Sequence, residues 1–140
     1  MRPTLSALAV AILMFALGAC GDSSDDKAQA TVCDARADIG KQVDQLKSLT
    51  AATVTKDAVT QSLDTIKNDL DDMSSARADL SSERRSQAEA ANKSFTSSVK
   101  EIKSELLISL SASDAKTALV TALQQLEATY QKTFEPVDCS

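Results

Sequence analysis

From residue 32 onward, the apolar residues of this 140-residue chain recur at intervals of three and four. This spacing places side chains on one face of an α-helix, whereas a half-buried β-strand requires strict alternation. Four such stripes follow one another, and each predicts an amphipathic helix. The stripes are Val32, Ala35, Ile39, Val43, Leu46 and Thr50; Val59, Leu63, Ile66, Leu70, Met73 and Leu80; Ala88, Phe95, Val99, Ile102, Leu106 and Leu110; and Ala115, Leu119, Leu123, Leu126, Tyr130 and Phe134. The pattern predicts an all-α fold.

Cap residues and a proline mark the predicted helix boundaries. Thr53 or Thr55 can cap the second helix, because a threonine hydroxyl accepts a hydrogen bond from a free N–H of the first turn. Ser111, followed three residues later by Asp114, approximates a capping box for the fourth helix. Pro136 cannot continue a helix and is expected to end the fourth one.

The N-terminus has the pattern of an export signal. A cationic start with Arg2 precedes an apolar run from Leu5 to Leu17. About 13 residues are too few to cross a bilayer as a helix, which takes roughly 20. The run therefore predicts the hydrophobic region of a signal peptide rather than a permanent membrane span.

The residues that end this run, Leu17-Gly18-Ala19-Cys20, resemble the lipobox of bacterial lipoproteins. The resemblance implies that the Cys20 thiol takes a diacylglyceryl group with acyl chains such as palmitate. It also implies that residues 1–19 are a cleaved signal peptide, and that the lipid anchors the chain to the extracytoplasmic face of a membrane. In a Gram-positive host this is the cell membrane, whereas a Gram-negative host allows the outer membrane. The alternative is an ordinary secretory signal followed by a spare thiol.

Residues 20–31 contain three aspartates among small polar residues and show no apolar periodicity. Such a composition predicts an acidic, flexible tether of roughly 20 Å, which separates the lipid from a helical domain over residues 32–140. A cation site at the aspartates is the alternative, but nothing in this stretch fixes its geometry.

Cys33 and Cys139 decide how many helices the domain has. Two cysteines in an exported domain predict a disulfide, and its Cα atoms must lie within about 7 Å. No Gly or Pro marks a turn between Ser74 and Ser82, so the second and third stripes allow one long helix. Three antiparallel helices would place the cysteines at opposite ends, whereas four bring them together. We therefore expect an antiparallel up-down four-helix bundle closed by a terminal disulfide. A redox or metal-binding thiol pair is the alternative, although CxxC spacing is absent.

The composition excludes several classes of activity. The chain has no His and therefore lacks the imidazole used by Ser-His-Asp and Cys-His nucleophiles and by most zinc and haem sites. Its net charge of −5 and 3% aromatic content argue against a nucleic-acid partner. The sequence has three glycines and no Gly-rich phosphate loop. We expect no enzymatic activity, no cofactor and no metal.

Leu107 and Ile108 form a candidate contact for a partner or for the membrane. Ile108 projects nearly opposite the third stripe and Leu107 lies at its edge, so an exposed apolar patch is one interpretation. The other is that the following turn and the fourth helix cover both side chains.

Two charged groups have less specific interpretations. The segment 64–72 contains four aspartates, but no EF-hand register fits them, and a solvated helix face is expected. The arginines of segment 83–85 could bind an anion through their guanidinium groups, yet solvated charges in the first turn of the third helix are the simpler reading.

The chain as a whole resembles small, secreted, helical lipoproteins of high-GC Gram-positive bacteria, with a Cys near each end of the domain and Ser-Glu-Arg-Arg at 82–85. This resemblance implies no particular activity. We expect a membrane-anchored, non-enzymatic helical interaction module whose partner is a protein or another envelope component. The alternative is a carrier or binder of a lipid or other apolar ligand. A monomer is expected, since four stripes in one chain can cover one another, although heptad-like spacing also allows a coiled coil between chains.

Overall fold

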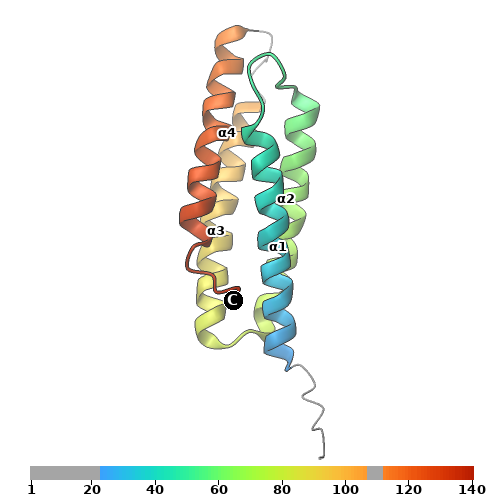
Figure 1. Cartoon of the computed structure of the whole chain (residues 1–140), viewed down its shortest axis with the longest axis vertical. Coiled ribbons are helices and arrows are strands. Elements are labelled where there is room, and N and C mark those ends of the chain that lie inside the picture. The colour runs from blue at the N-terminus through green and yellow to red at the C-terminus, as the bar shows by residue number, and fades with distance from the viewer. Residues whose placement is uncertain (1–22, 107–111) are drawn as a thin grey trace, which may run out of the picture.

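A computed structural model describes residues 23–106 and 112–140, which form four α-helices. These are α1 (Ser24–Lys47), α2 (Lys56–Ala76), α3 (Ser82–Leu106) and α4 (Ser113–Phe134), with a short 3₁₀ helix, η1 (Arg77–Asp79), between α2 and α3. Consecutive helices run in opposite directions (Figure 1). Each helix packs against its neighbours in sequence, and α4 packs against α1. The predicted up-down four-helix bundle is confirmed.

The first helix begins at Ser24, so the prediction of a flexible tether over residues 20–31 was wrong for its larger part. The hydroxyl of Ser23 caps the helix by accepting a hydrogen bond from the Asp26 N–H at 3.2 Å. Acidic residues in the first turn are favoured by the helix dipole. Ala28 extends the first stripe by one turn and is only 6% exposed. Two alanines, Ala28 and Ala30, among polar residues are too weak an apolar signal to reveal this turn in the sequence.

The chain reverses between α2 and α3 within the predicted stretch from Ser74 to Ser82. The carboxylate of Asp25, in the first turn of α1, accepts hydrogen bonds from the Ser81 N–H at 2.7 Å and from the Arg84 guanidinium at 3.0 Å. Arg85 donates to three carbonyl groups of the same connection at 3.0 to 3.1 Å. Side chains therefore hold a turn that lacks glycine and proline.

The predicted stripes form the core. All side chains of the second and third stripes that the structure describes are buried. The side chains of Leu106 and Leu110 in the third stripe lie outside the described part. In the first stripe only Thr50 is exposed, because it lies beyond the end of α1. In the fourth, Ala115 and Tyr130 are half-buried. The remaining positions are buried and fill the space between the helices.

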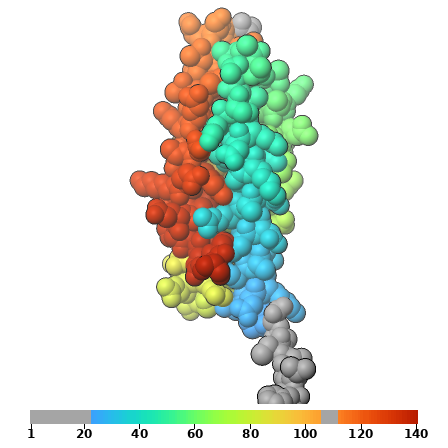
Figure 2. Space-filling view, in the orientation of Figure 1, coloured from blue at the N-terminus to red at the C-terminus, as the bar shows by residue number. Residues whose placement is uncertain are grey.

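Two valines outside the helices complete the core. Val54 lies in the α1–α2 connection and Val137 follows α4, with exposures of 2% and 3%. The last helix ends at Phe134, two residues before Pro136, as predicted. The C-terminal segment then lies against α1, on the face shown in Figure 2. Burial of Val137 thus requires the chain to cross from α4 to α1.

The caps follow the predictions in part. Thr55 caps α2, with its hydroxyl accepting from the Ala58 N–H at 3.2 Å. The Thr53 hydroxyl instead accepts a hydrogen bond from the Thr50 N–H, within the α1–α2 connection. Ala112 occupies the N-cap position of α4 and has no side-chain acceptor, so the capping box was placed at the wrong residue. Ser111 itself lies outside the described residues.

Candidate functional site

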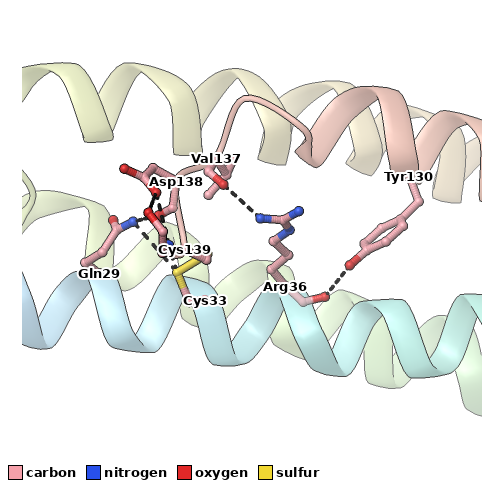
Figure 3. The surroundings of a disulfide bond; sticks show 8 residues. Gln29, Cys33, Arg36, Tyr130, Val137, Asp138 and Cys139 are labelled. Atoms are coloured by element: carbon pink, nitrogen blue, oxygen red, sulfur yellow. Dashed lines mark hydrogen bonds between the residues drawn. A yellow bond between two sulfur atoms is a disulfide. The ribbon is translucent and has the colours of Figure 1, made fainter.

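A disulfide joins Cys33 of α1 to Cys139 of the C-terminal segment, with a Cα–Cα distance of 5.6 Å. The predicted pairing is confirmed. Figure 3 shows that side chains of α1 flank the bond on both sides. The Gln29 amide donates a hydrogen bond to the Asp138 carbonyl, and Arg36 donates to the Val137 carbonyl at 2.8 Å. The C-terminal segment is therefore held by one covalent bond and by polar contacts to its backbone.

Tyr130 provides a second link between α1 and α4. Its hydroxyl donates to the Arg36 carbonyl at 2.8 Å, and burial raises the pKa of Tyr130 above its usual value of 10, so the phenol remains a donor at neutral pH. Gly40 makes this approach possible, because a Cβ there would lie 2.8 Å from the Tyr130 hydroxyl oxygen. The single glycine of the bundle thus serves packing between helices.

Asp69 is an unfavourable charge at the α1–α2 contact. One of its carboxylate oxygens is buried and has no hydrogen-bond partner in the described part of the chain. Burial, followed by the negative charges of Asp38 and Asp72, raises the pKa of Asp69 above its usual 3.8. The nearby Lys41 ammonium lies 2.6 Å from Asp38 and offsets this effect only in part.

Replacing Asp69 by Asn is therefore expected to raise the free energy of unfolding at pH 7. Because the pKa of Asp69 is raised by folding, its ionised form destabilises the native state above that pKa. This gain in the free energy of unfolding should shrink as the pH falls through the pKa that Asp69 has in the native protein. It should vanish below the pKa that Asp69 has in the unfolded chain. Urea titrations of both proteins between pH 7 and pH 3 measure this difference. Asp57→Asn makes the same substitution at an exposed position in the first turn of α2 and is the matched control. A gain that is independent of pH would contradict this explanation.

Surface hollows lie between neighbouring helices. The hollow between α3 and α4 measures about 550 Å³, and Ser86, Ala90, Ser94 and Thr129 are among the small side chains that line it. The hollow between α2 and α3 measures about 360 Å³ and has leucine and valine on its floor. The α2–α3 hollow combines leucine and valine with three lysines, whereas the α3–α4 hollow is lined mainly by small side chains and has one lysine, Lys132.

The lysines at this hollow were not singled out by sequence reasoning. Lys67 comes from α2, and Lys100 and Lys103 come from α3. Their only signal is spacing, because Lys93, Lys100 and Lys103 follow one flank of a helix. Solvated helix faces commonly carry lysines at such intervals, so the sequence alone does not mark them as a site.

Three predicted site residues lie outside the described residues: the lipid acceptor Cys20 and the candidate contacts Leu107 and Ile108. The arginines of segment 83–85 are engaged by the chain's own acceptors, which argues against the anion site considered there. The described ranges contain no group of three or more potential metal ligands. They also contain no helix with the length and apolar character needed to span a membrane.

Comparison with known proteins identified no relative. The chain matches no protein-family model, no curated protein and no solved structure at a significant level.

Proposed function

We propose that this protein is a membrane-anchored extracytoplasmic lipoprotein whose helical domain is a non-enzymatic interaction module. The motif Leu17-Gly18-Ala19-Cys20, placed directly before the bundle, carries the proposal. The disulfide between Cys33 and Cys139 supports it, because such bonds persist in oxidising compartments outside the cytoplasm.

The position of α1 determines how an anchored bundle would be presented. Only residues 21–23 separate Cys20 from the first residue of α1, so the lipidated residue lies within about 14 Å of that helix. The end of the bundle that contains the start of α1 and the α2–α3 connection would then face the membrane. The opposite end would stand about 35 Å farther out, at 1.5 Å per helical residue.

The outer end of the bundle is the surface that we assign to a partner. The α1–α2 connection at this end, residues 48–55, and the segment 106–113 contain no charged residue. Depletion of charge is typical of the centre of a protein interface. Leu107 and Ile108 belong to the second segment, so this arrangement favours an envelope protein, rather than the anchoring membrane, as the partner that contacts them.

One experiment tests both the anchor and the contact. Cells that express the wild-type chain, Cys20→Ser or Ile108→Glu are fed a radiolabelled fatty acid, treated with a crosslinker and fractionated. Cys20→Ser should lose the label and leave the membrane, because it lacks the acceptor thiol. Ile108→Glu should keep the label and lose a specific crosslinked species.

Ser104→Glu, on the exposed surface of α3, adds the same charge near this end and serves as the control. A label that persists on Cys20→Ser would refute the lipid anchor. Crosslinks that are identical in Ile108→Glu and in the wild type would refute the contact.

A carrier or binder of an apolar ligand is the second candidate function, and the hollow between α2 and α3 favours it. Phe95, Ile66 and Leu123 have no exposed surface, so the bundle interior is occupied by its own side chains. A ligand would therefore bind in the groove between two helices rather than inside the bundle.

A further inference from the structure

Two adjoining hollows follow the groove between α2 and α3. An apolar hollow of about 360 Å³ and a polar hollow of about 420 Å³ share Thr96 and Lys100. They lie at successive levels of the same groove, because the helix positions that line the polar hollow are closer to the α2–α3 connection. The groove therefore changes from apolar to polar along its length.

The apolar hollow can hold an alkyl chain. Leu63, Leu70 and Val99 form its floor, and the methylene stems of Lys67 and Lys103 extend its walls. Its volume lies within the range of small-molecule sites in proteins, roughly 300 to 1,000 Å³.

The polar hollow can hold an anion. Arg77, Lys93 and Lys100 line it, and its carboxylate, from Glu89, lies 3.7 Å from the Arg77 guanidinium. Lys93 and Lys100 form no ion pair with any residue that the structure describes. Lys100 thus lines both hollows, and no carboxylate of the described residues forms an ion pair with it.

The charge of the groove is opposite to that of the chain. Five cationic side chains line the two hollows, against the two carboxylates of Asp71 and Glu89, whereas the whole chain carries −5. Lys67 pairs with Asp71 at 2.6 Å and Lys103 with Asp64 at 3.1 Å. All four of these side chains are more than half exposed, and exposed pairs contribute little. With Asp64 counted, three carboxylates face the five cationic side chains, so the groove carries an excess of two positive charges on an acidic protein.

We propose that this groove binds a single-chain amphiphile with an acidic headgroup. The alkyl chain lies over Leu63, Leu70 and Val99, and the headgroup is held by Lys100 with Lys93 and Arg77. This inference rests on the second candidate function, the carrier, and is independent of the lipid anchor on Cys20.

The test uses the full chain with Cys20→Ser, which removes the lipid acceptor and leaves the bundle unchanged. Dodecyl phosphate, below its micelle concentration, is titrated calorimetrically at low and at physiological salt. We expect one binding site, with affinity that falls as salt rises. Lys100→Glu should weaken binding about fivefold or more, because it replaces an attraction by a repulsion.

Lys132→Glu makes the same charge change on the exposed surface of α4, a helix that does not line the groove, and should leave the affinity within about twofold. Inorganic phosphate has no chain and dodecyltrimethylammonium has the opposite charge, so both should bind far more weakly than dodecyl phosphate. Equal losses in the two lysine variants, equal binding of the two dodecyl compounds, or no binding of dodecyl phosphate would overturn the proposal. Because Cys20 is absent from every protein tested, none of these results depends on whether the chain is lipidated.

Discussion

Replacing Cys33 and Cys139 together by serine is expected to lower the free energy of unfolding by about 4 kcal/mol. The disulfide closes a loop between residues 106 positions apart, and its loss restores the conformational freedom of that loop in the unfolded chain. A small domain has a total stability of about 5 to 15 kcal/mol, so this loss is a large share of it. The native contacts of Val137 and Arg36 remain available to the variant.

Urea denaturation, followed by circular dichroism, measures this effect. The wild-type protein under reducing conditions should unfold at the same urea concentration as the double variant, whereas reductant should not shift the double variant. Cys20→Ser, which leaves the disulfide intact, should match the oxidised wild type. A loss of less than about 1 kcal/mol in the free energy of unfolding would contradict this expectation. It would show that the unfolded chain retains so much structure that closing the loop with a disulfide restricts it little further.

Replacing Phe95 by Ala is expected to cost about 3 to 5 kcal/mol. Phe95 has no exposed surface, and its ring centre lies 5.9 Å from that of Tyr130 and 5.4 Å from that of Phe134. These three rings are all the aromatic side chains after residue 20. Truncation leaves a cavity at the contact between α3 and α4 and removes both edge-to-face contacts.

Phe95→Leu keeps most of the buried volume and should lose clearly less stability than Phe95→Ala. Lys93→Ala, on the exposed side of α3, controls for the change in helix propensity and should shift stability by less than about 0.5 kcal/mol. Equal losses in Phe95→Ala and Phe95→Leu would show that ring geometry, rather than volume, sets the contribution of this residue.

The apolar spacing predicted most of the fold because each stripe must be covered by another in a chain of this length. It failed where burial depends on small or isolated residues. Ala28 carries the first helix back to Ser24, yet alanines are common on exposed and buried faces alike. Thr50 matches the first stripe in spacing but lies beyond the end of α1, since spacing does not show where a helix stops.

The cysteine pair could be predicted from sequence because the requirement for nearby Cα atoms restricts the topology. The groove between α2 and α3 could not be predicted from the sequence. Lys67 and Lys100 are 33 positions apart, and only the packing of α2 against α3 brings them to one hollow. Similarly, the pattern around Asp25 shows an acidic segment, whereas its contact with Arg84 depends on the position of the α2–α3 connection.

The sequence by itself determined the helical class, the number of helices and the disulfide partners, and it supplies the motif on which the proposed lipid anchor rests. Each of these depends on short-range spacing, on a local motif or on a single distance limit. The tertiary structure decided that α1 begins close to Cys20, that Gly40 accommodates Tyr130, and that cationic and apolar side chains share one groove. Those features depend on which helix faces meet and at what height, and this is set by packing across the whole bundle.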